Sequence, residues 1–168
     1  MYGVTAPQLL VAILFVALVA FAAYTDATSF RISNRITTGL AALYPAWVVS
    51  SPIPVDWTAA LAVAGGVFAV GFALFAAKAV GGGDVKLLAA AALWAGPGMI
   101  LDFLLVAAIT GGALALVMAT GARFSVARVC EMCGAVPLRD AVLGSAVPYG
   151  VAIATGALVC IAPTLFGV

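Results

Sequence analysis

The chain has 168 residues, of which 66% are hydrophobic and only 8% are charged. Soluble domains are nearer half apolar and a quarter charged, so this composition excludes a water-soluble globule and predicts a protein that is solvated mainly by lipid. Seven basic residues and a net charge of +1 are too few for a nucleic-acid-binding surface. Histidine is absent, which excludes Ser-His peptidase chemistry and the H-E-x-x-H zinc site.

Six apolar runs follow one another along the chain, and a bilayer core takes about 20 residues per helical span. The runs cover residues 7–24, 36–50, 57–80, 85–96, 99–120 and 141–166. The triplet Gly96-Pro97-Gly98 separates the fourth run from the fifth, either as a full turn between two helices or as a kink within one span. We predict an all-α fold with six transmembrane helices, in a single integral membrane domain over residues 1–168.

The basic residues distinguish six spans from five, because cytoplasmic loops collect Lys and Arg. With six spans, all seven fall in the first, third and fifth loops: Arg31, Arg35, Lys78, Lys86, Arg123, Arg128 and Arg139. With five spans, the last three would change sides. We therefore expect a multi-pass protein of the inner (cytoplasmic) membrane with both termini outside and these three loops in the cytoplasm.

The fifth loop, residues 121–140, has an apolar stripe at helical spacing. The stripe consists of Ala122, Val126, Val129, Cys133 and Val136. This pattern predicts one amphipathic helix that lies in the cytoplasmic interface of the membrane. The alternative is a disordered polar loop.

Two of the six acidic residues stand out by their positions. Asp26 directly follows the first run, and Asp84 follows three glycines between the third and fourth runs. With six spans, both lie at cytoplasmic helix ends, near a membrane in which ionisable groups are rare and often functional. Two adjacent carboxyls can share one proton, so that one acts as acid and the other as base. Their spacing alone would favour two unrelated residues that face water.

The glycines that precede Asp84 favour a functional site. Each of Gly81, Gly82 and Gly83 weakens a helix by about 1 kcal/mol relative to alanine. Irregular backbone at membrane depth is tolerated only where it lines water or is buried in protein. Glycine also allows an extended substrate to approach the backbone closely. We therefore interpret the run as part of a site rather than a simple loop.

Three elements, in this order along the chain, resemble the motifs of type IV prepilin peptidases. The segment from Asp26 to Asn34 resembles D-x-x-x-x-x-I-P-N, with Ile32 and Asn34 in register. Residues Gly81–Asp84 match G-x-G-D, and the chain continues with Val85-Lys86-Leu87. Pro148-Tyr149-Gly150 resembles P-Y-G. Ser33 stands where the family usually has proline. G-x-G-D alone is a weak signal in any glycine-rich protein, but the three elements together in a six-span frame are a strong one.

The resemblance implies an intramembrane-type aspartic endopeptidase, distantly similar to presenilin, with Asp26 and Asp84 as its catalytic residues. Its substrate would be a prepilin, with a short basic leader that is cut at the cytoplasmic membrane face just before a hydrophobic helix. Residues implied to bind substrate or support the site are Gly81, Gly82, Gly83, Ile32, Asn34, Lys86, Pro148, Tyr149 and Gly150. No metal or cofactor is implied, and the only other partner expected is membrane lipid, with no nucleic acid.

The similarity is closest to the short members that serve tight-adherence (Flp) pilus systems, with archaeal preflagellin peptidases as the alternative. Bifunctional members carry two C-x-x-C pairs in an N-terminal cytoplasmic segment and also methylate the product. This sequence shows no such segment, so we do not expect methyltransferase activity. Cys130 and Cys133 form a single C-x-x-C pair, whereas zinc takes four ligands, so we assign them a structural role.

Two other classes of function could use such residues. A proton-coupled carrier would also use membrane carboxylates, but it predicts a mid-span carboxylate and usually an inverted repeat, and the sequence contains neither. A non-enzymatic scaffold protein would tolerate replacement of Asp26 by asparagine. Lys86, two residues after Asp84, could tune that carboxyl or anchor its helix at the lipid headgroups.

Overall fold

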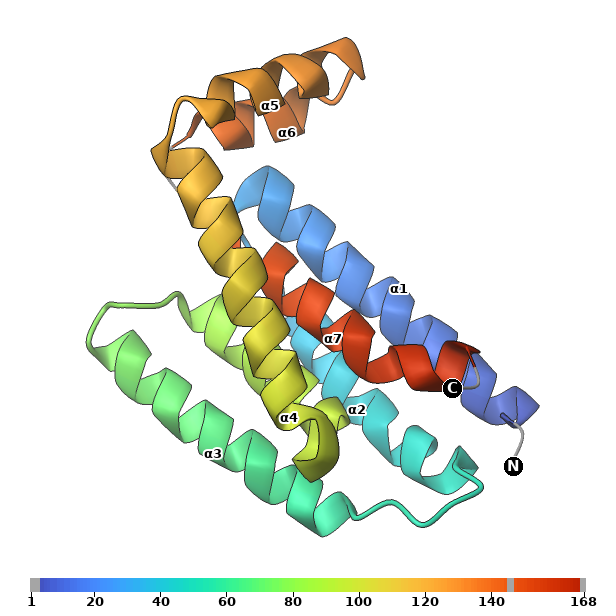
Figure 1. Ribbon diagram of the computed structural model, residues 1–168. Helices are drawn as coiled ribbons and strands as arrows, with labels where there is room; N and C mark the ends of the chain where they lie inside the picture. The colour runs from blue at the N-terminus through green and yellow to red at the C-terminus, as the bar shows by residue number, and fades with distance from the viewer. Residues whose placement is uncertain (1–3, 145–146, 167–168) are drawn as a thin grey trace.

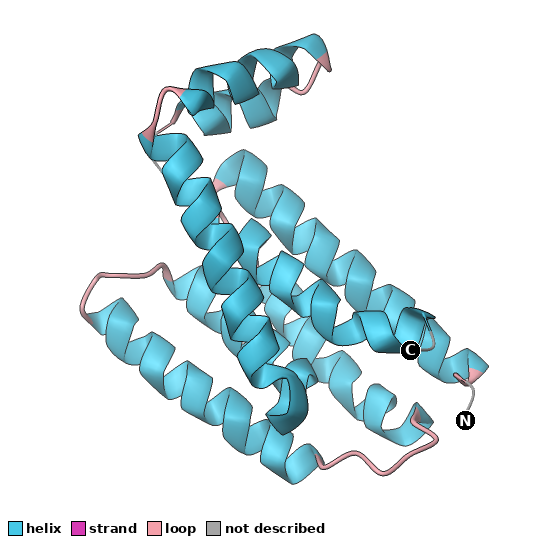
Figure 2. Ribbon diagram, in the orientation of Figure 1, coloured by secondary structure: helices cyan, strands magenta, loops and turns pink. Residues whose placement is uncertain are grey.

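The computed structural model describes residues 4–144 and 147–166, and in these residues the chain forms α-helices and no strands (Figure 2). The helices are α1 (Ala6–Ser29), α2 (Asn34–Ser50), α3 (Trp57–Ala76), α4 (Gly82–Ala119), α5 (Ala122–Met132), α6 (Val136–Leu143) and α7 (Tyr149–Phe166). The all-α prediction is confirmed.

Three of these helices, α1, α3 and α4, are long and apolar enough to cross a membrane, and residues 149–163 of α7 form a shorter apolar helix. Many large apolar side chains point away from the bundle, among them Phe72, Leu105 and Ile109, which are 55%, 58% and 63% exposed. Such a surface is stable in lipid and would aggregate in water. The chain is therefore a membrane protein, while the number of six spans stays a prediction.

Helix α4 contains both the fourth and the fifth predicted runs. Within it, Gly96 has φ 57° and ψ −172°, a conformation that glycine adopts readily, and Pro97 follows. Figure 1 shows α4 turning back on itself at this point. Leu88 before the turn and Leu104 after it line the same cavity. Of the two alternatives for this segment, the structure has the full turn.

The core lies where α1, α2, α7 and the first half of α4 meet. Phe15, Leu40 and Leu87 are fully buried there. The Trp94 indole N–H donates to the Leu40 carbonyl oxygen at 3.0 Å, and its ring centroid is 4.3 Å from that of Phe15. Figure 1 places the start of α1 and the end of α7 at one end of the bundle. The α1–α2 and α3–α4 connections lie toward the other end.

The predicted single helix over residues 121–140 is wrong, because the segment forms two helices, α5 and α6, joined by a turn. Gly134 in that turn has φ 72°, which interrupts the helix. Arg139 of α6 joins the two helices through its ion pair with Glu131 of α5 at 3.3 Å, and it also pairs with its neighbour Asp140 on α6 at 2.8 Å. The alternative of a disordered loop is also wrong.

The apolar stripe of this segment does not face the protein. The buried residue of α5 is Ala127, which was not assigned to the stripe. Val126, Val129 and Val136 are 38%, 59% and 47% exposed, and Cys133 is exposed too. Residues 141–143 of the sixth predicted run belong to α6, so the last apolar helix begins at Tyr149 instead of Ala141.

Candidate active site

Asp26 lies inside α1, not after it as predicted, because the helix continues five residues beyond the predicted end of the first run. The helix ends at Phe30, which adopts the left-handed conformation with φ 51° and donates its backbone N–H to the Asp26 carbonyl oxygen at 2.9 Å. This turn directs residues 31–33 away from the axis of α1. The Asp26 side chain is only 5% exposed, so its carboxyl is buried among helices.

The partner of the buried Asp26 carboxyl comes from the far end of the sequence. The Gly150 backbone N–H, in the first turn of α7, donates to Asp26 Oδ2 at 2.6 Å across 124 residues. The first N–H groups of a helix have no partner within that helix, so they are free to bind an oxygen here. A Cβ atom on Gly150 would lie 2.8 Å from both Cβ and Oδ2 of Asp26. Only glycine allows this approach without a shift.

Asp84 stands in the first turn of α4, where Gly81 is the N-cap residue. Each of the three glycines meets a different neighbour: a Cβ would lie 2.8 Å from Asp84 Oδ2 at Gly81, 3.2 Å from the Phe75 ring at Gly82 and 3.3 Å from Ile32 Cβ at Gly83. Gly82 and Gly83 are helical, which corrects their assignment to an irregular connection. The missing side chain of Gly83 allows the start of α4 to pack against Ile32 in the segment after α1, and that of Gly82 allows it to pack against Phe75 of α3.

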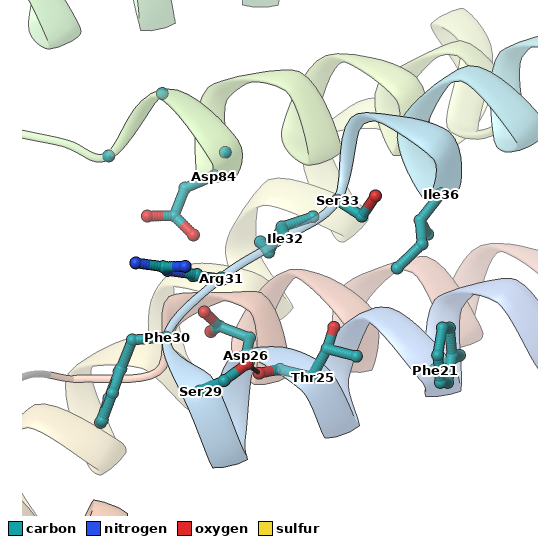
Figure 3. Close-up of a pocket in the computed structure, with 13 residues that line it drawn as sticks. Phe21, Thr25, Asp26, Ser29, Phe30, Arg31, Ile32, Ser33, Ile36 and Asp84 are labelled. Carbon is teal, nitrogen blue, oxygen red and sulfur yellow. Dashed lines mark hydrogen bonds between the residues drawn. The ribbon is translucent and has the colours of Figure 1, made fainter.

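Asp26 and Asp84 line one cavity of about 660 Å³. Figure 3 shows their carboxyl groups pointing toward one another, one from α1 and the other from α4. The predicted residues Gly81, Gly82, Gly83 and Ile32 line the same cavity. Within the described ranges, the ion pairs are those of Arg139, so neither aspartate is matched to a cation there.

Several cavity-lining residues were not predicted: Phe21, Thr25, Ser29, Phe30, Arg31, Ser33 and Ile36. Most lie between or beside the motif positions of the Asp26–Asn34 segment, so their closeness to Asp26 in sequence was the available signal. Arg31 brings a guanidinium to the cavity, and in the view of Figure 3 its side chain is drawn between the two aspartates. Thr25, Ser29 and Ser33 add hydroxyls to its wall.

The other predicted residues lie around the cavity. Lys86 Nζ donates to Asn34 Oδ1 at 3.0 Å. This hydrogen bond connects the Gly81–Asp84 motif at the start of α4 with the Asp26–Asn34 motif, whose last residue begins α2. Pro148 directly precedes α7, and Tyr149 is 46% exposed and lines a second cavity that also contains Asp84. The three resembling elements therefore meet at one place, although the predicted residues Asn34, Lys86, Pro148, Tyr149 and Gly150 do not line the larger cavity.

Among the residues that the structure describes, no group of three or more Cys, Asp and Glu side chains is arranged to hold a metal ion. Cys130 and Cys133 are free thiols, the first half-buried and the second exposed. Cys130 lies on α5 and Cys133 caps its C-terminal end, and neither lines the cavity of the two aspartates.

The fold and the site define a helical membrane protein with two carboxyls facing each other across a cavity at the helix ends. The model of the type IV leader peptidase family matches residues 13–116, well over half of the chain, and the chain belongs to this family. Membership implies leader peptidase activity and a prepilin as the general kind of substrate. Nothing among curated proteins or solved structures matches the chain. The matched range includes Asp26 and Asp84 and ends before Gly150.

Proposed function

We propose that the chain is an aspartic endopeptidase that removes the short basic leader of an Flp-type prepilin at the cytoplasmic membrane face, with Asp26 and Asp84 as the catalytic pair. The observation that carries the proposal is the arrangement of these two carboxyls, which line one cavity and point toward one another from α1 and α4. Two carboxyls at such a site need only one proton between them to function as an acid and a base.

In the proposed reaction, a water molecule held between the carboxyls attacks the carbonyl carbon of the scissile peptide bond. The ionised carboxyl takes a proton from this water as the new C–O bond forms, and the protonated carboxyl donates its proton to the carbonyl oxygen. The tetrahedral intermediate then collapses, the C–N bond breaks, and the nitrogen takes a proton from the pair. The products are a leader with a new carboxylate and a pilin with a new amine, without any cofactor.

The surroundings support both parts of this reaction. The Gly150 N–H fixes one oxygen of Asp26, which leaves the other oxygen to face the cavity. Gly81 has no side chain beside Asp84, so an extended substrate could approach that carboxyl along the glycine backbone. Positioned groups of this kind reduce the entropy that the reaction must lose.

The placement in the membrane is proposed from lengths and charges. Residues 82–95 of α4 would span only about 21 Å at 1.5 Å per residue, less than the roughly 30 Å hydrocarbon core. Asp84 would therefore lie recessed or beside a thinned membrane, where water can reach it. The positive-inside rule favours both termini outside and this end of α4 in the cytoplasm. A basic leader would extend from its hydrophobic helix into the cytoplasm on the same side.

Co-expression with an Flp-type prepilin tests the proposal, with leader removal scored by gel shift and mass spectrometry. The Asp26→Asn and Asp84→Asn variants should each leave the precursor uncut at normal protein abundance. The Asp102→Asn variant is the matched control, since Asp102 is exposed and outside both cavities. Normal processing by either site variant would remove that residue from the mechanism. If the chain were a scaffold protein or a carrier, the precursor would stay uncut with the unaltered protein as well as with every variant.

The substrate class and the methylation question have separate readouts. A preflagellin supplied in place of the pilin should be cut less efficiently if the chain serves a tight-adherence system. The mass of the mature pilin N-terminus should equal that of the free amine, because we propose no methyltransferase activity. A product heavier by one methyl group in cells that lack other methylating peptidases would contradict this part of the proposal.

A further inference from the structure

A second cavity of about 380 Å³ lies beside the first, between the two halves of α4 and the start of α7. We call it the α4–α7 groove. Its lining residues are Ala79, Val80, Asp84, Leu88, Leu104, Ala107, Ala108, Gly111, Gly112, Ala115, Tyr149, Ala152 and Ile153. Apart from Asp84 and the Tyr149 hydroxyl, this lining offers no polar side chain, so the groove is suited to an apolar ligand.

The groove is continuous with the cavity of the two aspartates through Asp84, the one residue that lines both. Tyr149, which also lines the groove, directly precedes the glycine whose N–H binds Asp26. The two cavities differ in chemistry: the larger combines Phe21, Phe30, Ile32 and Ile36 with hydroxyls, a guanidinium and two carboxyls, whereas the groove is formed mainly by Ala, Gly, Val, Leu and Ile. A ligand that filled both could carry polar groups on one side of Asp84 and would be apolar on the other.

Small residues make the groove accessible to a helix. Ala107, Ala108, Gly111, Gly112 and Ala115 recur at the spacing of one helix face, and in lipid such faces allow a second helix backbone to approach closely. A Cβ on Gly111 would be 3.4 Å from Ala152 Cβ, so Gly111 packs against α7, whereas a Cβ on Gly112 would meet nothing within 4 Å. Gly112 therefore faces open space.

The surroundings indicate where such a helix would come from. Ile109 and Leu116, on the same half of α4, are 63% and 66% exposed, which is typical of a surface that faces lipid. The groove thus lies next to a surface that lipid would cover, and a membrane-embedded segment could reach it without crossing a polar layer.

We propose that the α4–α7 groove seats the first turns of the prepilin's hydrophobic helix, which begins directly after the cleaved bond. This inference rests on the proposed function. Cleavage places the scissile bond between Asp26 and Asp84, and the groove beside Asp84 offers an apolar path for the chain that follows this bond. The change from the more polar cavity to the apolar groove at Asp84 matches the change from basic leader to hydrophobic helix in the substrate.

The test uses the full-length protein in liposomes with a synthetic precursor made of a basic leader, a glycine and an apolar helix of about 20 residues. Gly112→Leu should fill the groove without displacing backbone and lower kcat/KM for this precursor by about ten- to a hundredfold, mainly through KM. Gly66→Leu on α3 is the matched control, because a Cβ there also meets nothing within 4 Å and Gly66 lies in neither cavity. It should leave cleavage unchanged.

A second measurement locates the bound helix. Gly112→Cys, in a protein with Asp84→Asn and its three native cysteines replaced, should cross-link to a precursor that carries one cysteine within the first turns of its apolar helix. Cleavage by Gly112→Leu with unchanged KM, or cross-links only between two copies of the protein, would overturn the groove while the peptidase reaction stands. Failure of the unaltered protein to cut the precursor would instead overturn the proposed function.

Discussion

Gly150→Ala adds one methyl group at the point where α7 holds Asp26, so it tests whether the peptide N–H of α7 positions that carboxyl. Gly150 is outside the left-handed region, and its backbone would accept alanine. The new Cβ, however, would lie 2.8 Å from Cβ and Oδ2 of Asp26 and 2.9 Å from its Cγ. Either α7 or the carboxyl must move by about 0.6 Å to reach ordinary van der Waals contact.

Such a movement lengthens the bond from the Gly150 N–H to Asp26 Oδ2, which is 2.6 Å long. Hydrogen bonds to charged groups contribute about 1.5–3 kcal/mol, and about 1.4 kcal/mol corresponds to a tenfold change in rate. We therefore expect kcat/KM for precursor cleavage to fall by about ten- to a hundredfold. A shift of about 1 Å at a reacting group alone can have an effect of that size.

The assay is leader removal from a purified precursor in liposomes, at enzyme amounts equalised by immunoblot. Gly65→Ala on α3 is the control, because a Cβ at that position meets nothing within 4 Å. Activity of Gly150→Ala within about twofold of the unaltered protein would refute the positioning role of α7. Loss of both activity and folded protein would instead show that the contact is needed for folding, so thermal unfolding of each variant is measured in parallel.

Three further predictions concern the same framework. Lys86→Met and Asn34→Ala should each lower kcat/KM by about fivefold, the equivalent of a hydrogen bond of about 1 kcal/mol. The double variant should lose no more activity than either single variant. Additive losses would show that the 3.0 Å hydrogen bond between Lys86 and Asn34 does not couple the two motifs. Gly156→Ala places a Cβ 2.6 Å from the Phe103 carbonyl oxygen, so it should force α4 and α7 apart and lower the free energy of unfolding by about 1–3 kcal/mol, measured by denaturation in detergent micelles; an unchanged midpoint would contradict the close contact. Hydrogen bonds from the Ala59 N–H and the Thr58 hydroxyl lower the pKa of the Asp56 carboxyl below its usual 3.8, so the stability that this N-cap contributes is present at neutral pH and is lost as the pH falls through that lowered pKa. Asp56→Asn caps without titrating, and the difference in Tm between the two proteins should therefore be constant above about pH 5 and change below about pH 4; a pH-independent difference would refute this origin.

The sequence allowed the helical class and the pairing of motifs to be predicted, because both depend on strong local signals. Runs of apolar residues leave little choice but helices in lipid, and Asp26 and Asp84 follow or begin such runs. The fold then brings the two aspartates to one cavity. The number of membrane crossings and the catalytic roles remain predictions, since they depend on a bilayer and a substrate.

Other features could not be predicted, for physical reasons that differ. The bond between Gly150 and Asp26 joins residues 124 positions apart, and no local pattern specifies such a partner. The turn between α5 and α6 depends on Gly134 adopting a positive φ, and the residues around Gly134 do not predict that conformation. The apolar stripe of that segment was misleading because, next to a membrane, apolar residues can face lipid as well as protein. Periodicity therefore identifies the helix but not its packed face.

The position of Asp84 on the wall of two cavities has a consequence for inhibitor chemistry. A compound with a hydroxyl or amine head for the larger cavity and an unbranched aliphatic tail for the groove would occupy both at once. Because the two parts are covalently joined, binding of one raises the effective concentration of the other, and the combined affinity exceeds that of either fragment. The linker has to pass a single carboxyl, so its length should determine potency more sharply than the length of the tail.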